Sequence, residues 1–476
     1  MDTDFCNRKK TSLWIAGLLV LWGMPATLFS MNVSASLLMI AGVVVLLFMF
    51  GWVFFNIKIA SFSIPFAAVF GPVVKFNIFG SEVMLADAYL LGLLFILMLK
   101  NHLFNFRPAY ASLSFIRYPL LGILLLSVMV SQSPAGSLVA LIQVATLYFL
   151  YVLTLNCIST EEEIGSVTLA WVVATCAASV VVLYFYFQGI YLIEIYEKGE
   201  SDRVIGANFF FRATYIYSGF HYLVGGSAVV VLVRLLKQGT LSERAGYMAL
   251  FVFLALTVVL MNIKTTIYAV ILVGGFFVIR SMLTMNKGKL LGFTMLLLLI
   301  LVIPVKLMLS NVTDDQLALL FQRFEGSDSL DMRNDVYQNL LRYFFEHPLS
   351  FLLGVGPGLT NRYDDSQDQE LLRVFGGEGA IDSSYLTFMF EYGVVILCMV
   401  MFVVGEAVFK LRRSIDWAKW SPSKDVQVVL LYWAITATTQ LSGISKNAWL
   451  LAQAVALAHC VARYTTQTRI QASKFK

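Results

Sequence analysis

Residues suited to binding an anion gather in two polar segments, residues 188–213 and 310–382. Lysine is absent from the longer segment, and the arginines of the two segments are Arg203, Arg212, Arg323, Arg333, Arg342, Arg362 and Arg373. A guanidinium group binds phosphate oxygens through two parallel hydrogen bonds, whereas an ammonium group binds as a point charge. The pattern predicts at least one phosphate-binding site. For any single arginine a structural ion pair is the alternative, because the longer segment also holds 13 acidic residues.

Two acidic residues lie where the longer segment meets the next apolar run. The segment closes on GGEGAID, ending at Asp382, and Glu391 follows within SSYLTFMFEYG. A carboxylate at this position could act as a general base toward a hydroxyl group. It could equally cap the helix that follows, since aspartate before an apolar run is an ordinary N-cap. Both roles stay open for Asp382.

A helix is predicted from Asp331 to His347, because Asp331 can cap it and Pro348 stops it. Arg333 and Tyr337 lie one turn apart on the same face of this helix, beside an apolar stripe. The glycine-proline cluster at residues 354–358 follows as a tight turn. Its spacing matches neither a dinucleotide-binding fingerprint nor a P-loop, so the sequence does not indicate a nucleotide site.

The elements that must position these residues are membrane spans. The chain is 59% apolar and 13% charged, whereas a soluble domain is roughly 45–50% apolar and about 25% charged. This composition excludes an ordinary cytosolic enzyme, a disordered chain and a nucleic-acid-binding domain. The five cysteines avoid both long polar segments, so no disulfide framework is predicted there.

The hydropathy pattern predicts an all-α polytopic fold of about 12–14 spans. The candidate spans are 12–30, 35–55, 59–75, 83–99, 118–132, 137–157, 166–187, 214–233, 246–262, 266–283, 290–309, 383–409, 426–442 and 448–464. The first is interpreted as an uncleaved signal anchor. The third contains Pro65, Gly71 and Pro72, so a re-entrant segment is its alternative.

Lysine and arginine indicate the orientation, because cytoplasmic loops are enriched in both. With both termini in the cytoplasm, 22 of the 34 basic residues fall inside, including the turn that begins at Arg234. The predicted organisation is an N-terminal bundle (1–309), a large outer loop (310–382), and C-terminal spans with a basic tail (383–476). Lys264 then lies in a short outer turn between two spans.

Within the spans, Asp87 and Glu406 are ionisable residues, which are functional candidates by default in a membrane. Asp87 is the weaker candidate because it lies near Glu82 at a predicted span end. The histidines and cysteines lack metal-ligand spacing, so neither a metal nor another cofactor is predicted.

The order of these motifs resembles the Wzy/WaaL superfamily of bacterial O-antigen and exopolysaccharide polymerases and O-antigen ligases. The matching pieces are Arg203-Val-Ile-Gly206, Asn262-Ile-Lys264-Thr265, Arg323-Phe324, Arg333 with Tyr337, His347-Pro348-Leu349, Gly354-Val355-Gly356-Pro357-Gly358, and Asp382 with Gly393. They cover residues 200–395, and the remainder of the chain resembles the family in hydropathy alone.

The resemblance implies a GT-C-like membrane enzyme in the bacterial inner membrane. It implies metal-independent, inverting glycosyl transfer from an undecaprenyl-diphosphate-linked oligosaccharide on the periplasmic face. The diphosphate would be bound by Arg203, Arg333 and Lys264, with Arg212 and Arg323 as further candidates. A flippase and a chain-length regulator are the implied protein partners. In this comparison Asp382 stands in the catalytic motif position, with Tyr337 and Glu391 near the acceptor.

Two departures from the family pattern separate the possible activities. Ligases carry a histidine where this chain has Asp382, which favours a repeat-unit polymerase over a ligase. Lys264 replaces the usual arginine, which keeps the charge but loses the bidentate geometry. A flippase or transporter of the same lipid-linked sugars is the other alternative, and it would depend on Asp87 and Glu406 within the spans.

Overall fold

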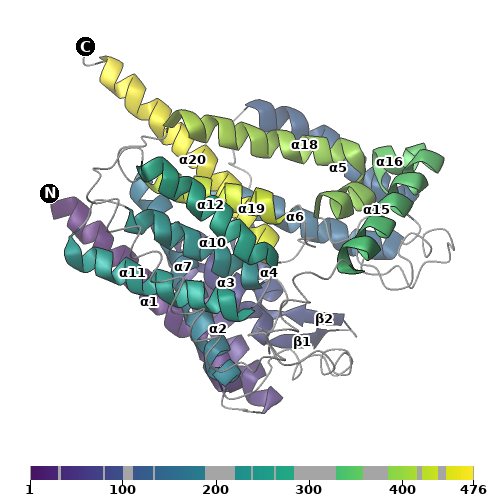
Figure 1. Ribbon diagram of the computed structural model, residues 1–476. Coiled ribbons are helices and arrows are strands. Elements are labelled where there is room, and N and C mark those ends of the chain that lie inside the picture. The colour runs from purple at the N-terminus through teal and green to yellow at the C-terminus, as the bar shows by residue number, and fades with distance from the viewer. Residues whose placement is uncertain are drawn as a thin grey trace, which may run out of the picture.

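The computed structural model describes residues 2–30, 34–78, 81–99, 111–131, 134–187, 220–236, 240–261, 264–282, 328–356, 384–414, 421–437 and 446–474. These residues form α-helices together with one 3-10 turn and one short β-hairpin (Figure 1). The all-α polytopic fold class is therefore confirmed. α1 begins and α20 ends at the left of Figure 1, whereas α15 and α16 lie at the right.

The first half of the chain forms α1 (Asp2–Ser30), α2 (Ala35–Phe55), α3 (Lys58–Phe70), η1 (Gly71–Val73), β1 (Lys75–Ile78), β2 (Ser81–Met84), α4 (Leu85–Leu99), α5 (Ala111–Val130), α6 (Pro134–Cys157) and α7 (Glu161–Phe187). The second half forms α10 (Phe220–Leu235), α11 (Leu241–Met261), α12 (Lys264–Met282), α15 (Asp328–Glu346), α16 (Pro348–Leu353), α18 (Ser384–Ser414), α19 (Pro422–Thr436) and α20 (Lys446–Lys474).

Within the described ranges, four helices are long and apolar enough to cross a membrane, namely those at Ser36–Phe55, Glu161–Tyr186, Ser242–Met261 and Tyr385–Leu411. Seven shorter apolar helices accompany them. The predicted span 35–55 coincides with α2, and the predicted spans 166–187, 246–262 and 383–409 fall on α7, α11 and α18. The span predicted at 290–309 lies outside the described residues.

The third predicted span is shorter than expected and lies at the centre of the bundle. α3 ends at Phe70, and the chain continues through η1 into an antiparallel hairpin in which Lys75 pairs with Met84. Every residue from Ile59 to Phe70 is buried. The helix is therefore surrounded by protein along nearly its whole length, which explains why it tolerates polar side chains.

Pro65 within α3 leaves the carbonyl of Ser61 without its usual helical donor, because proline has no backbone N–H. The side-chain amide of Gln453 donates to that carbonyl at 2.9 Å. The Trp171 indole N–H donates in turn to the Gln453 side-chain oxygen at 2.5 Å. A buried polar chain therefore links α3, α7 and α20.

Two helix starts are fixed by reciprocal capping. The Glu163 carboxylate accepts from the backbone N–H of Thr160 at 3.1 Å, and the Glu163 N–H donates to the Thr160 hydroxyl at 3.3 Å. Thr240 and Glu243 repeat this arrangement at the start of α11. Lys58 also pairs with Glu163 at 2.5 Å, so the start of α7 is held against the start of α3.

A buried ion pair joins three helices at the opposite end of the bundle from α15. The Arg234 guanidinium on α10 lies 2.7 Å from the Asp425 carboxylate on α19, and it also donates to Thr168 on α7 at 2.8 Å. The sequence places Arg234 at the start of a basic turn on the cytoplasmic side. Its side chain is only 5% exposed, and Asp425 neutralises it inside the protein.

Candidate functional site

The segment after α16 is bound directly to the backbone of α18. The backbone N–H of Val355 donates to the Phe390 carbonyl at 2.9 Å, and that of Gly356 donates to the Glu391 carbonyl at 3.2 Å. These carbonyls are available because α18 breaks at Gly393, whose φ of 80° and ψ of 162° are not helical. We call this contact between residues 354–356 and 390–393 the glycine crossover.

Glycine is required on both sides of the glycine crossover. Gly354 has φ 81°, and a Cβ atom there would lie 2.3 Å from the Glu391 carbonyl oxygen. A Cβ atom at Gly393 would lie 2.1 Å from the Leu352 carbonyl oxygen. No side chain can occupy either position without moving a backbone. The two segments therefore pack main chain against main chain.

Serine hydroxyls from two further helices surround the glycine crossover. The Ser127 hydroxyl on α5 donates to the Glu391 carbonyl at 3.5 Å. Ser131 follows α5, and its hydroxyl accepts from that of Ser137 on α6 at 2.6 Å. A Cβ atom at Gly356 would lie 2.0 Å from the Ser131 hydroxyl oxygen. The turn after α16 is thereby fixed to α5 and α6 as well as to α18.

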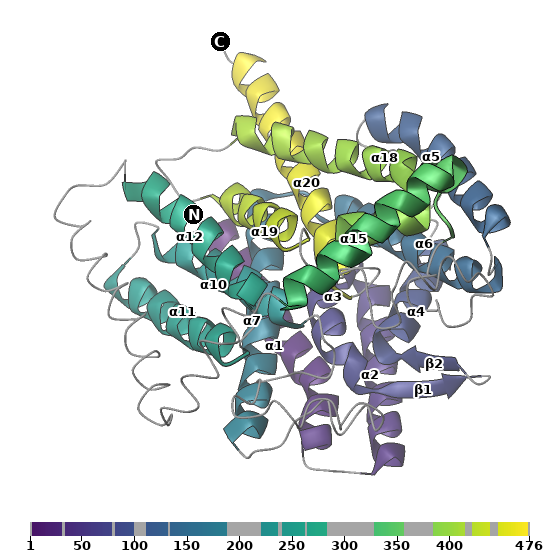
Figure 2. The ribbon, with the colours of Figure 1, turned by 45° about the vertical axis from the view of Figure 1, so that its right-hand side comes forward.

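An aromatic cluster holds α15 on the first turns of α18. Its buried members are Leu340, Tyr343, Phe344, Val355 and Phe390, and Tyr337 packs against them. The ring centroids of Tyr343 and Phe390 lie 6.1 Å apart. α15 crosses this end of the bundle, running from α16 toward the ends of α10 and α12 (Figures 1 and 2).

The first turns of α10, α12 and α18 meet the last turns of α19 at the same end. A Cβ atom at Gly225 would lie 2.1 Å from the Tyr432 hydroxyl and 2.9 Å from the Thr266 methyl group. α10 and α19 therefore approach each other more closely than a side chain at 225 would allow. The Tyr385 hydroxyl on α18 donates to the Ala434 carbonyl on α19 at 3.0 Å.

The structure describes four of the eight predicted site residues. Arg333 lies in α15, one turn before Tyr337, and Lys264 is the first residue of α12. Tyr337 packs in the aromatic cluster, and Glu391 is only 3% exposed at the glycine crossover. The other four, Arg203, Arg212, Arg323 and Asp382, lie outside the described residues.

Several residues that build this region were not singled out from the sequence. Ser131 and Ser137 fix the turn after α16, and Tyr432 and Thr266 bring α19 and α12 together. The available signal in the sequence was the position of the glycines. In the structure Gly354, Gly356 and Gly393 all have positive φ angles, which glycine adopts readily. The hydroxyl residues had no such signal, since serine and threonine are common in packed membrane helices.

The two ionisable residues predicted within spans have different surroundings. Glu406 forms an ion pair with Lys410 one turn further along α18. Asp87 lies in the first turn of α4, directly after the hairpin. In the part of the chain that the structure describes, no three His, Cys, Asp or Glu side chains are grouped closely enough to bind a metal ion.

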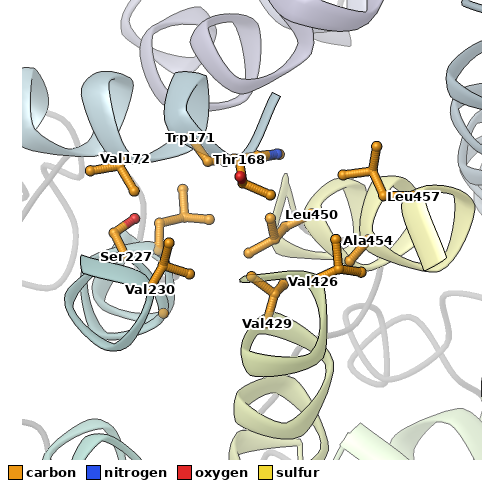
Figure 3. Close-up of a pocket in the computed structure, with 12 residues that line it drawn as sticks. Thr168, Trp171, Val172, Ser227, Val230, Val426, Val429, Leu450, Ala454 and Leu457 are labelled. Atoms are coloured by element: carbon orange, nitrogen blue, oxygen red, sulfur yellow. The ribbon is translucent and has the colours of Figure 1, made fainter. Parts of the chain in front are cut away.

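An apolar cavity lies between α7, α10, α19 and α20 (Figure 3). Thr168, Trp171, Ser227 and Val230 line it, together with aliphatic side chains from α19 and α20. Its volume is about 20 Å³, and its lining holds no charged residue. A cavity of this size has room for about one water molecule. It therefore cannot bind a diphosphate or a sugar, and we treat it as a packing defect.

Residues 249–401 match the Wzy_C family model, which is described as O-antigen ligase. No curated protein matches the chain. The matched region extends from α11 through α12, α15 and α16 to most of α18, and so includes the glycine crossover and the aromatic cluster. The resemblance to the Wzy/WaaL superfamily is confirmed by this match. Residues 249–401 are thus similar to O-antigen ligases, and the apolar helices identify the chain as a multi-pass membrane protein.

Proposed function

We propose that this protein is a polymerase of undecaprenyl-diphosphate-linked oligosaccharide repeat units, acting on the periplasmic face of a bacterial inner membrane. The observation that carries the proposal is the glycine crossover. It holds α15, which contains Arg333 and Tyr337, against the first turns of α18. α18 begins two residues after Asp382. This packing of α15 on the first turns of α18 supports a site in which Arg333 meets the leaving group and Asp382 meets the acceptor.

The leaving group of such a transfer is a lipid diphosphate, whose developing negative charge requires fixed cations. Arg333 in α15 and Lys264 at the first residue of α12 are both on elements that reach this end of the bundle. Arg203, Arg212 and Arg323 are the further candidates from the motifs. A set dominated by guanidinium groups suits the bidentate recognition of phosphate oxygens.

Asp382 is the better candidate for the base that activates the acceptor hydroxyl. It precedes Tyr385 by three residues, and three residues of chain span at most about 11 Å. Tyr385 is fixed by its hydrogen bond to Ala434. Glu391 is 3% exposed and its own carbonyl is engaged in the glycine crossover. We therefore assign Glu391 a positioning role at the helix break and keep the acceptor contact for Asp382.

The ligase alternative requires a histidine at the position of Asp382. His347 is the nearest histidine in the motif region, and it precedes α16 with its ring 4.6 Å from that of Tyr343. This packing against the aromatic cluster supports a structural role for His347. The matched family is described as O-antigen ligase, so the match does not favour a polymerase. Our preference for a polymerase depends on the presence of Asp382 at the position where ligases have a histidine.

The transporter alternative requires ionisable residues within the spans to carry the function. Glu406 is neutralised by Lys410 on its own helix. Asp87 lies at a helix start beside the hairpin, where an interfacial position accounts for its charge. Neither observation favours a transport pathway through these two residues.

The test is the size distribution of lipid-linked glycans in a strain that lacks the protein, complemented with wild type, Arg333→Ala or Asp382→Asn. We expect single repeat units to accumulate without long chains in both variants. Arg342→Ala is the matched control, because Arg342 is an exposed arginine on the same helix. We expect it to restore long chains.

Two outcomes of the same experiment would contradict the proposal. Long chains that form but remain on the diphosphate carrier in the deletion strain would indicate a ligase. Normal chain length in Arg333→Ala or Asp382→Asn, at wild-type expression, would remove these residues from the reaction.

A further inference from the structure

α15 and α16 expose a group of large apolar side chains on their surface. Phe345 is 86% exposed, Leu349 69% and Leu341 51%, and Phe351 and Leu352 are exposed beside them. We call these five residues the apolar corner. A group of this kind is costly in water and marks a surface that is covered in the working protein.

The apolar corner is not the buried side of α15. Leu340, Tyr343 and Phe344 form that side and pack on α18. Leu341 and Phe345 lie one turn apart on a neighbouring side of the helix, about 100° round from Leu340 and Phe344. Arg342 and Glu346, each one residue further along, are exposed as well. α15 is thus apolar on two sides, with one side packed on protein and the other open.

The surroundings of the apolar corner indicate what covers it. α16 packs against α18 and α5, two apolar helices of the membrane bundle (Figure 1). α5 exposes apolar side chains from Leu121 onward, and Met129 near its end is 79% exposed. Ser131, two residues later, lies against Gly356 directly after α16. The apolar corner therefore adjoins a surface of α5 that faces lipid in a membrane protein.

We propose that the apolar corner inserts into the membrane interface and anchors α15 and α16 to the lipid surface. Amphipathic segments at such an interface bury their apolar side chains about 5–10 Å into the boundary between headgroups and acyl chains. This contact would fix the depth of α15 at the level of the lipid headgroups. A lipid-linked substrate carries its diphosphate at that level. The proposal concerns a lipid contact and holds for any reaction at the neighbouring site.

The experiment places the photoreactive residue p-benzoylphenylalanine at single positions of the full-length protein in phosphatidylethanolamine–phosphatidylglycerol nanodiscs. Position 345 tests the apolar corner, and position 129 is the positive control on the exposed face of α5. Position 346 is the negative control, because Glu346 is an exposed acidic residue that points about 100° away from Phe345 around α15. Irradiation is followed by mass spectrometry of lipid adducts.

We expect the lipid adduct at position 345 to approach that at position 129 and to exceed that at 346 several-fold. Phe345→Ser should lower lipid adduct from a probe at 349 by about tenfold, because burial of one phenylalanine side chain shifts an equilibrium by at least that factor. Phe345→Leu should leave it nearly unchanged. Position 345 is almost fully exposed, so neither replacement threatens folding.

Two results would overturn the proposal. One is the absence of lipid adduct at 345 in a sample where position 129 gives it. The other is cross-linking from 345 to peptides, of this chain or of a second protein, in place of lipid. The readout is independent of glycan polymerisation, so its failure would leave the proposed enzymatic function untouched.

Discussion

Replacing Gly393 with alanine tests whether the glycine crossover holds the candidate site together. The backbone at Gly393 has φ 80° and ψ 162°, and a side chain in this region of conformational space costs about 1–3 kcal/mol. The new Cβ atom would also lie 2.1 Å from the Leu352 carbonyl oxygen. The two backbone segments must therefore separate.

Separation removes two hydrogen bonds, those from Val355 and Gly356 to the carbonyls of Phe390 and Glu391. Each contributes about 0.5–1.5 kcal/mol, so the total penalty of Gly393→Ala is roughly 2–6 kcal/mol. A penalty at the lower limit of this range raises the equilibrium constant for opening of the glycine crossover by about thirtyfold. We expect the backbone amides of Val355 and Gly356 to exchange hydrogen faster by at least that factor.

The same α18 helix offers a matched control. Gly405 is exposed, and a Cβ atom there meets nothing within 4 Å. Gly405→Ala should stabilise α18 by about 1 kcal/mol, because alanine is the better helix former. It should leave exchange at Val355 and long-chain glycan formation unchanged. If Gly393→Ala also leaves both unchanged, the crossover does not position the site, and our account of it is wrong.

Two further predictions concern the buried polar contacts of the bundle. Asp425→Ala should destabilise the protein by about 3–5 kcal/mol in detergent thermal unfolding, because the Arg234 guanidinium stays buried. Arg234→Met combined with Asp425→Leu should recover most of that loss, and a double variant no more stable than Asp425→Ala would contradict this account. Gln453→Leu should cost about 1–3 kcal/mol, because the Ser61 carbonyl loses its donor. The cost should fall in a Pro65→Ala background, where a backbone N–H is restored, and an equal cost in both backgrounds would show the reasoning to be mistaken.

Local physical chemistry was sufficient to predict most helices. α2 coincides with its predicted span, since a long apolar run must satisfy its backbone within a helix. The helix predicted from Asp331 to His347 is α15, and Pro348 begins α16 as expected of a proline at a helix start. The helix start came out three residues earlier than predicted, because no local signal marks it as strongly as Pro348 marks its end.

Charge pairing was not predictable from sequence position. Arg234 follows a long apolar run and begins a basic turn in the sequence, yet it pairs with Asp425 from a distant helix. Lys58 pairs with Glu163 in the same way. Each pair depends on which helices become neighbours, and hydropathy carries no information about that choice.

The sequence by itself determined that this chain is helical, rich in membrane-spanning segments and equipped with arginines outside them, because composition and periodicity are local properties. Only the tertiary structure decided that the backbones at Gly354 and Gly393 pack directly against each other, and that Tyr337 lies against α18. Because glycine has no side chain, its place in the sequence does not indicate which segment it will contact. The role of such a glycine is recognised only in the folded structure, where a second backbone occupies the place that a Cβ atom would take.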